Sequence, residues 1–390
     1  MGNAERKCIT VAIYSHPELY PPVLNVIDEL ADVYDQVQVI SRNVKTSHWQ
    51  YPAAVRLFVS GKPMAIRDSE QASIWWKMSS FLRFTRDFYK ALKREKQEWI
   101  MCNDPIALYS FRLVRPFLGY RVKLWYHNHD VTELTSVRKY SVGYFAVKSE
   151  RKYFGRIDLF TLPSEARLNY FPMKRLKGKW LIVPNYPSLR RMGEQQRTDW
   201  KPGENLKLLY QGHIGDDHGL EEIIAFVKTD SSLQLTIVGP GNANFVEELR
   251  NKIINLGIRE RAMVLDPVPY SELPHITKTH HVGLAVHEPV NIAFRTAALA
   301  SNKIYEYAAS GLLVIYYKDE HYMRYLGKYN LCFPTNLSEQ DLSGIIQEIK
   351  ANFSSLSQSA QSGFQAMLNF GAVFHPVLAH ISGFSASVNL

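Results

Sequence analysis

Cysteine is scarce in this sequence and long apolar runs are missing, and each shortage excludes a class of protein. Only three cysteines, Cys8, Cys102 and Cys332, occur among 390 residues, and they are far apart. An odd number without metal-ligand spacing excludes a disulfide framework and a zinc site, and predicts buried thiols in a reducing compartment. No segment approaches the roughly 20 apolar residues that span a bilayer, and no secretory leader is evident, so we expect a cytoplasmic protein.

The charge balance is basic. The chain carries 46 Lys and Arg against 37 Asp and Glu, a net charge of +9. Such an excess favours an anionic partner, which can be nucleic acid, an acidic membrane surface or a phosphorylated substrate, and charge alone does not choose among them. The chain is too long for one typical core, so two domains of about 150 to 200 residues are expected.

Strand-like and helix-like segments alternate through both halves of the chain. In the first half, strands are predicted at 9–15, 36–42, 99–103, 122–128, 158–164 and 181–185, and helices at 21–34, 72–98, 105–119 and 142–153. A second alternating series runs from about 206 to 317. Such alternation predicts parallel sheets with helices on both faces. The expected fold class is α/β, with two Rossmann-like, doubly wound domains facing each other across a cleft.

Composition sets the expected domain boundaries. We expect an N-terminal Rossmann-like domain over 1–187 and a C-terminal one over 206–370. The polar segment 188–205 contains Pro and Gly and no apolar period, which predicts a linker. Residues 371–390 are predicted to form a C-terminal helix and tail that return to the N-terminal domain. Doubly wound domains bind ligands at the carboxyl ends of their strands, so the site is expected there.

Residues 301–315, SNKIYEYAASGLLVI, form the most informative segment of the chain. Ser301 is a plausible N-cap, and Asn302 and Lys303 then fall in a first helical turn, where backbone N–H groups and the helix dipole attract a phosphate. Glu306 lies one turn later, where it could accept hydrogen bonds from ribose hydroxyls. The alternative is an ordinary amphipathic helix followed by a buried strand, and spacing alone does not decide between the two.

A glycine-rich turn at 238–245, VGPGNANF, follows a predicted strand and opens a predicted helix. Gly239 could approach a phosphate closely, or the turn could simply need small residues. Asn244 stands where a dinucleotide fingerprint needs a third glycine, so a nicotinamide oxidoreductase is disfavoured.

Another strand, glycine turn and helix are predicted at 210–223. His213 and His218 in this segment could face an anion. Asp216 and Asp217 superficially suggest a metal site, but no further carboxylate or histidine falls at a supporting spacing, so a solvated turn is the better interpretation and no metal is predicted.

In the first half, the segment 125–131, WYHNHDV, brings polar groups to the end of a predicted strand. His127 and His129 alternate with Asn128, so the two histidines share one face of an extended segment. A pair at i and i+2 without a third ligand is a weak metal site. A polar residue that hydrogen-bonds sugar hydroxyls or a carbonyl is preferred over a merely packed histidine.

Residues 73–98 interleave aromatic and basic side chains, among them Trp75, Trp76, Lys77 and Arg83. Such a helix can lie on an anionic bilayer with aromatics inserted and cations at the head groups. Alternatively, its apolar face covers the sheet while the charges meet water. The composition leaves both interpretations open.

With these segments in order, the chain resembles the GT-B fold glycosyltransferases, in particular the GT4-like (glycosyl transferases group 1) family. The segment at 301–315 is similar to the donor-site pattern PNKLFEYMAAGLPVV of that family. Residues 208–224 and 235–241 resemble the first two strands and turns of its nucleotide domain, and 264–274 an element near the base. Residues 123–131 look like the strand that ends in its acceptor-side histidine.

The resemblance implies roles for individual residues. Glu306 would bind the donor's ribose, Asn302 and Lys303 would lie beside its pyrophosphate, and Gly212 would permit close approach. His129 would be the sugar-proximal, catalytic histidine. The full expected set is, for the donor, Ser301, Asn302, Lys303, Glu306, Gly212, His213, His218, Gly239, Val268 (lining the base pocket) and Arg295, and on the acceptor side His16, Asn128 and Asp130, with no metal.

Two positions depart from the family pattern. Ala298 stands where many members carry a second glutamate, eight residues before the one that matches Glu306. The basic pair expected after the first strand of the nucleotide domain is replaced by His213 and His218. Lys303 and the helix dipole, with Arg295 as a second cation, could compensate in part.

The implied reaction is transfer of a hexose from a UDP or GDP sugar to an acceptor hydroxyl with retention, without metal or cofactor. The product would be a surface polysaccharide or glycolipid, made by a cytoplasmic enzyme held at the inner face of the membrane through 73–98. One alternative is a sugar-nucleotide epimerase of the same architecture, which needs a pair of acid/base carboxylates that the sequence does not place. The other is a non-catalytic basic protein that binds anions or nucleic acid, for which no recognition helix, zinc module or aromatic RNA signature is present, so no nucleic acid partner is expected.

Overall fold

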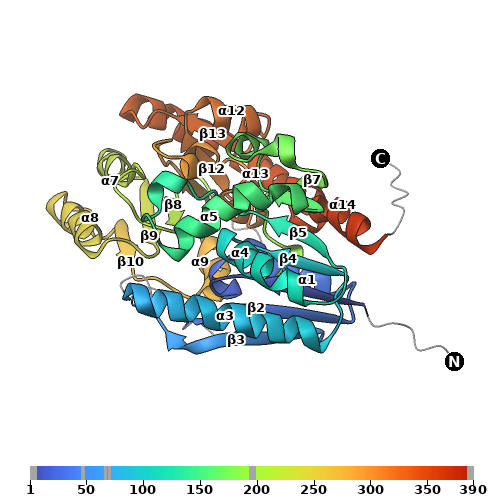
Figure 1. Cartoon of the computed structure of the whole chain (residues 1–390). Helices are drawn as coiled ribbons and strands as arrows, with labels where there is room; N and C mark the ends of the chain where they lie inside the picture. Colours follow the sequence, from blue (N-terminus) through green and yellow to red (C-terminus); the bar gives the residue numbers. More distant parts are fainter. Residues whose placement is uncertain (1–6, 45–48, 66–67, 69–71, 193–198, 384–390) are drawn as a thin grey trace. The chain divides into compact units, whose positions relative to one another are not determined.

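The computed structural model describes residues 7–44, 49–65, 68, 72–192 and 199–383. Two compact units make up the chain (Figure 1). The first is Met1–Asn185 with Val373–Leu390, and the second is Tyr186–Ala372. Of the segment predicted as a linker, 188–192 and 199–205 belong to the second unit, and 193–198 lie outside the described residues, as do 384–390 of the predicted tail.

A seven-stranded parallel sheet forms the centre of the first unit, in the order β3-β2-β1-β4-β5-β6-β7. Its strands are β1 (Cys8–Ala12), β2 (Gln36–Val44), β3 (Val55–Met64), β4 (Trp99–Cys102), β5 (Lys123–His127), β6 (Leu159–Leu162) and β7 (Lys179–Ile182). Its helices are α1 (Pro21–Ala31), α3 (Ile74–Arg94), α4 (Pro105–Val114), α5 (Val142–Tyr153) and α14 (Phe370–Ser382), which begins in the second unit. The strand order reverses between β1 and β4, which is where doubly wound sheets bind ligands.

Strand β3 was not predicted, and its position explains why. It pairs only with β2 at the edge of the sheet, so most of its side chains are partly or fully exposed. It also contains Gly61 and Pro63, which are unusual in strand interiors and are tolerated at edges. The sequence of β3 therefore has neither the continuous apolar run of a buried strand nor a clean alternation.

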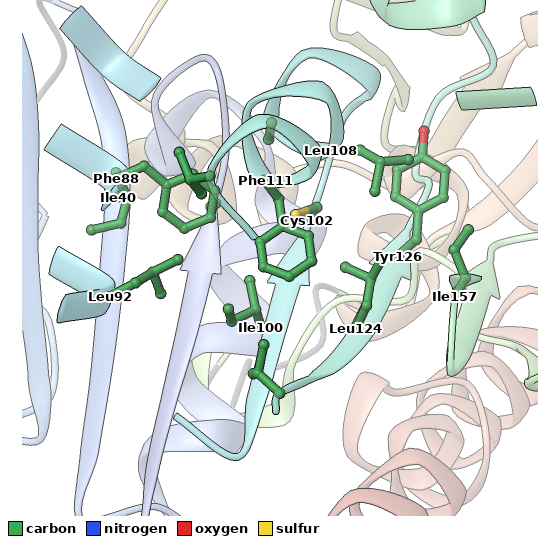
Figure 2. Packing of buried hydrophobic residues seen from close by; sticks show 14 of the residues in the cluster. Ile40, Phe88, Leu92, Ile100, Cys102, Leu108, Phe111, Leu124, Tyr126 and Ile157 are labelled. Carbon is green, nitrogen blue, oxygen red and sulfur yellow. The ribbon is translucent and has the colours of Figure 1, made fainter. Parts of the chain in front are cut away.

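The main core of the first unit lies between the sheet and the helices α3, α4 and α5 (Figure 2). Alternate strand residues, such as Ile100 and Cys102 of β4, point to this side, where they pack against Phe88 of α3 and Phe111 of α4. All four side chains are fully buried. Burying one such apolar side chain contributes roughly 1.5–3 kcal/mol, so the cluster holds α3 and α4 on the sheet.

Helix α14 covers the opposite face of the same sheet. Trp99 alternates with Ile100 and so points to this second side, where its indole Nε1 donates a hydrogen bond to the carbonyl oxygen of Ile381 at 3.1 Å. Trp125 of β5 lies against Phe374, with ring centroids 5.9 Å apart. The last described helix therefore completes the fold of the first unit.

The second unit is built on a six-stranded parallel sheet in the order β10-β9-β8-β11-β12-β13. Its strands are β8 (Leu206–Gln211), β9 (Leu233–Val238), β10 (Ala262–Leu265), β11 (Val282–Ala285), β12 (Leu313–Tyr317) and β13 (Cys332–Thr335). Its helices are α6 (Leu189–Met192), α7 (Leu220–Thr229), α8 (Ala243–Asn255), α9 (Leu273–Thr277), α10 (Ile292–Arg295), α11 (Asn302–Ala309), α12 (Glu320–Leu326) and α13 (Glu339–Ala366). Strand order reverses here between β8 and β11, which again marks a ligand position.

The cysteines lie in the interior, as the sequence predicts. All three cysteines lie among the described residues, are buried and form no disulfide. Across the parts of the chain that the structure describes, no helix combines the length and apolar character needed to cross a bilayer.

Candidate functional site

Two glycines bring the turns after β8 and β9 into contact. Gly212 has φ +119° and Gly239 has φ +149°, conformations that side-chain-bearing residues rarely adopt. A Cβ on Gly239 would lie 1.8 Å from the carbonyl oxygen of Gly212. Gly239 is therefore required because the two turns approach each other closely. This agrees with the interpretation that the turn needs small residues.

The side chain of Lys303 lies against the turn at Gly212. A Cβ on that glycine would lie 3.3 Å from Cε and Nζ of Lys303. The ammonium is 4.2 Å from the ring centroid of Tyr210 and donates a hydrogen bond to its hydroxyl at 3.2 Å. Burial lowers the pKa of Lys303 to about 7, although the nearby Glu306 opposes the shift. A cation that is costly to bury unpaired is favourably placed for an anionic ligand.

His218 is held in one tautomer by its surroundings. Its Nδ1 accepts a hydrogen bond from the backbone N–H of Gly215 at 3.2 Å and lies 2.6 Å from the hydroxyl of Tyr210. Because a backbone N–H only donates, the neutral ring carries its proton on Nε2, which faces Asp217 at 3.4 Å. Burial, with Lys303 and His213 nearby, lowers the pKa of His218 to about 4.

His287 extends this cluster beyond the end of β11. Its ring lies 5.2 Å from that of His218 and is stacked on Phe294. The side chain is 4% exposed, its Nδ1 has no hydrogen-bond partner among the described residues, and burial lowers its pKa well below the ordinary value. At neutral pH, His218 and His287 are therefore uncharged, whereas the amine of Lys303 titrates near pH 7.

Glu306 is buried one turn into α11. Its Oε1 accepts a hydrogen bond from the hydroxyl of Tyr270 at 2.7 Å, and its Oε2 accepts one from Nε2 of Gln211 at 2.7 Å. Burial raises its pKa, which these two donors and Lys303 partly offset. The carboxylate thus has its donors within the protein.

The space beside this carboxylate is small. A pocket of about 10 Å³, lined by Gln211, Tyr270, Thr277 and Glu306 among others, adjoins it. That volume is far below the roughly 300–1,000 Å³ of ordinary ligand pockets. The pocket beside Glu306 is therefore too small to hold a pentose, and Tyr270 is one of the residues that close it.

The remaining residues of the expected donor site occupy varied positions. Ser301 is the N-cap residue of α11, as predicted, although its hydroxyl makes no capping hydrogen bond. Asn302 follows it, half-buried, at the first position of α11, Val268 lies half-buried in the loop after β10, and His213 is exposed. Arg295 is exposed and donates to the carbonyl oxygen of Pro289 at 3.1 Å, so its guanidinium is engaged by its own loop.

Ala298 replaces the second glutamate of the family pattern, and Asp216 and Asp217 lie in the turn that superficially suggests a metal site. Ala298 is fully buried and its carbonyl accepts the hydroxyl of Tyr305 at 2.6 Å, so the position is closed by packing. Within the described residues, no group of three or more His, Cys, Asp or Glu side chains could hold a metal ion. Asp216 and Asp217 are therefore not part of such a group.

In the first unit, His129 lies in the segment that follows β5. Its ring is 4.8 Å from that of Tyr20, and Arg167 donates a hydrogen bond to its carbonyl oxygen at 2.7 Å. Burial, and then Arg167, lowers the pKa of His129 to about 4. The neutral ring lines a pocket of about 200 Å³, and its buried Nδ1 has no partner in the described structure.

The other acceptor-side candidates are divided between this region and the interior. His16 follows β1 and is 4% exposed, and its buried Nδ1 has no partner in the part of the chain that the structure describes. Asn128 donates to the hydroxyl of Tyr126 at 2.9 Å, and that hydroxyl in turn donates to Glu150. Asn128 therefore belongs to a buried network, whereas the side chain of Asp130 is exposed.

Sequence reasoning missed several groups that shape these sites. Tyr210, Gln211, Tyr270 and His287 contact the expected residues but were not singled out. Two signals were available, since Tyr210 and His287 stand at or just after the ends of strands at the point where the sheet order reverses. The contact of Tyr270 with Glu306 joins residues far apart in sequence and gives no local signal.

Comparison with known proteins bears on the fold. No protein-family model matches the chain, and no curated protein sequence matches it. Among solved structures, sucrose-phosphate synthase from Thermosynechococcus elongatus is similar with a TM-score of 0.71 and 14% identity, over 97% of this chain and 100% of that one. HepE from Anabaena in complex with UDP is similar with a TM-score of 0.65 and 14% identity, at the same coverages.

The chain has the GT-B fold. Its two parallel sheets, of seven and six strands, correspond to the two Rossmann-like domains of such proteins, and the predicted fold class is confirmed. A putative UDP-N-acetylglucosamine 2-epimerase from Listeria monocytogenes is also similar, with a TM-score of 0.59 and 12% identity over 97% of this chain and 98% of that one. At these identities the likeness establishes the fold, and activity must be argued from the site.

Proposed function

We propose that the protein is a glycosyltransferase that moves a sugar from a UDP or GDP sugar to an acceptor hydroxyl. The observation that carries this proposal is the cluster at the strand reversal of the second unit, where Lys303 lies at the start of α11 under Gly212. The first-turn N–H groups of α11, its dipole and an ammonium together suit a diphosphate. The similarity to a structure that holds UDP supports the same ligand class.

In this proposal the protein acts mainly by electrostatics. Charge that develops on the departing diphosphate is stabilised by Lys303 in its protonated form and by fixed backbone dipoles, without a metal ion. Glu306 binds the ribose once Tyr270 releases it, so donor binding is coupled to movement of the loop after β10. The sugar is a hexose, and it is transferred with retention.

His129 is the proposed acceptor-side catalytic group. Because burial lowers its pKa to about 4, it is a neutral imidazole at physiological pH and can hydrogen-bond a sugar hydroxyl through its unpartnered Nδ1. His129→Ala is expected to lower kcat while leaving nucleotide affinity within about twofold, because the residue belongs to the other unit from Lys303.

The proposal is tested by incubating the protein with a panel of UDP and GDP sugars and measuring thermal stabilisation. One or more should raise the melting temperature, since a ligand that binds only the folded state stabilises it. Lys303→Ala should remove most of this shift, and Lys228→Ala, an exposed lysine of the same unit, should retain it. If no nucleotide sugar stabilises the wild-type protein, the donor assignment fails.

A sugar-nucleotide epimerase is the second candidate, favoured by the similarity to the putative 2-epimerase. An epimerase converts a nucleotide sugar into its epimer without an acceptor, whereas a transferase needs one for turnover beyond slow hydrolysis. Proton NMR of a nucleotide sugar incubated with the protein and no acceptor distinguishes the epimerase from the transferase. A new anomeric doublet that keeps the nucleotide attached would support the epimerase.

We further propose that the product belongs to a surface polysaccharide or glycolipid, and that the enzyme binds the membrane peripherally through α3. One face of α3 covers the sheet, and the other is available for the proposed membrane contact. Phe84 and Phe88 are buried against the sheet, whereas Trp75, Met78 and Leu82 are 77%, 43% and 59% exposed. These three side chains are spaced i, i+3 and i+7, so they form one outward apolar stripe.

Vesicle co-sedimentation tests the membrane proposal. The protein should bind phosphatidylcholine vesicles that contain phosphatidylglycerol, and the double substitution W75A/L82A should weaken binding by about tenfold because both side chains lose apolar burial. Phe117→Ala removes another exposed aromatic, 67% exposed, and serves as the matched control. Equal binding by the double variant and the control would refute α3 as the membrane contact.

A further inference from the structure

A cavity of about 430 Å³ opens at the strand reversal of the first unit. Its walls include Tyr14 and Ser15, which follow β1, Arg42 of β2, and residues at the starts of α4 and α5. The volume lies within the roughly 300–1,000 Å³ of small-molecule pockets. All of its lining residues belong to the first unit, so the cavity is distinct from the cluster around Lys303.

The cavity is cationic. The guanidinium of Arg42 lies 5.0 Å from the ring centroid of Tyr14 and 5.6 Å from that of Trp76, so two aromatic rings hold it in place. Arg138 and Lys77 also line the cavity, and none of its described lining residues is Asp or Glu. Among the described residues, neither arginine forms a salt bridge with a carboxylate. Guanidinium groups without a protein counter-ion suit phosphate or carboxylate ligands.

Asp104 lies close enough to interact with the charge of Arg42, and its oxygens already accept backbone hydrogen bonds. It caps α4, accepting hydrogen bonds from the backbone N–H groups of Ile106 at 2.9 Å and Ala107 at 2.8 Å. Its other oxygen accepts the N–H of Tyr14 at 2.6 Å. Asp104 therefore weakens the positive potential of Arg42 but leaves its hydrogen-bond donors available to a ligand.

Aromatic rings line the same cavity, and one of them is held in a strained conformation. Tyr20, Trp76 and Tyr140 contribute to its walls. Tyr140 has φ +62° with a side chain that is 75% exposed, although bulky residues rarely adopt this conformation. Such strain costs of order 1–3 kcal/mol and concentrates at ligand sites. Aromatic faces of this kind pack against the C–H face of a sugar ring.

The cavity adjoins the pocket of His129. Both are lined by Tyr14, Ser15 and Tyr20. An acceptor that fills both would therefore place its anionic group near Arg42 and a hydroxyl near the imidazole.

We propose that this cavity binds a sugar phosphate, either free or as the head group of a sugar linked to a prenyl chain through a diphosphate. The phosphate would contact Arg42 and Arg138. The inference deepens the proposed transferase function by naming the class of its acceptor. Phosphate binding in the first unit can be measured by itself, whether or not a nucleotide sugar binds the second unit.

Isothermal titration of the full chain tests the proposal with four probes: glucose 6-phosphate, geranyl diphosphate, inorganic phosphate and glucose. Glucose 6-phosphate or geranyl diphosphate should bind at least about tenfold more tightly than glucose, and the tighter of the two identifies the free or lipid-linked source. Arg138→Gln, at an exposed position, should weaken that binding by about tenfold, as should Arg42→Gln. Arg156→Gln, an exposed arginine of the same unit, should not.

The second unit also attracts phosphate, so Lys303→Ala separates the two sites. Binding that survives Lys303→Ala and is lost in Arg138→Gln supports the proposal. Binding that is lost in Lys303→Ala and survives Arg138→Gln assigns the phosphate to the donor site and overturns the proposal, as does equal affinity for glucose. If no nucleotide sugar binds but the binding of glucose 6-phosphate still requires Arg138, the proposed transferase function is refuted and the proposed phosphate site is supported.

Discussion

The affinity of the second unit for a nucleotide sugar is expected to fall as the pH rises through neutrality, because Lys303 titrates there. Burial lowers the pKa of its ammonium to about 7. A diphosphate at the start of α11 would favour the protonated amine and raise that pKa. Binding below pH 7 then needs no proton, whereas binding above pH 7 must take one up, and the affinity declines over that range.

The magnitude follows from the fraction of amine that is protonated. With a pKa of about 7 this fraction is roughly nine-tenths at pH 6 and one-tenth at pH 8. Affinity should therefore drop by about tenfold, or about 1.4 kcal/mol, between these two values. His218 and His287 do not contribute, because burial lowers the pKa of His218 to about 4 and that of His287 well below its ordinary value.

Isothermal titration with a nucleotide sugar is the appropriate assay, because its diphosphate diester does not itself titrate in this range. Measuring the heat in two buffers of different ionisation enthalpy counts the protons taken up at pH 8. Lys303→Arg keeps a cation at every pH, so it should bind with an affinity that is flat from pH 6 to pH 8. A wild-type affinity that is equally flat, or an Arg variant that retains the slope, would refute the assignment of Lys303 as the titrating cation.

Three further changes test the packing described above. Gly239→Ala places a Cβ 1.8 Å from a backbone oxygen and should destabilise the protein by more than about 3 kcal/mol in urea unfolding, whereas Gly257→Ala, also at positive φ but in open space, should cost about 1 kcal/mol. Burial raises the pKa of Glu150 to about 7 from 4.5, so the free energy of unfolding should fall as pH rises between these values, and Glu150→Gln should remove that dependence. Tyr270→Phe takes a donor from the buried carboxylate of Glu306 and should destabilise by about 1–3 kcal/mol, and unchanged stability would contradict the hydrogen bond.

Much of the fold was predictable because its signal is local. The helix and strand at 302–317 were predicted from an apolar period, a glycine and a β-branched run, and α11 and β12 confirm them. The edge strand β3 was not predictable in this way, because a strand with one neighbour and exposed faces needs no apolar pattern. Local periodicity reports burial, and it is silent where burial is slight.

The sites depend on contacts between distant segments, which periodicity does not encode. The position of Lys303 at the start of a helix was predictable, but the enclosure of Glu306 by Gln211 and Tyr270 joins three separate elements. In the same way, Arg42 and Arg138 line one cavity only because the sheet order brings their segments together. The roles assigned to these residues in binding and catalysis stay predictions until the assays above are done.

The path of the chain has a consequence for biosynthesis. Because the first unit ends at Asn185 and resumes only at Val373, the ribosome makes the second unit before it makes the part of α14 that belongs to the first unit. Throughout that interval the indoles of Trp99 and Trp125 lack the helix that covers them. Elongation therefore leaves an unfinished apolar face for chaperones to shield, and premature termination anywhere before residue 373 would yield a product that never closes it.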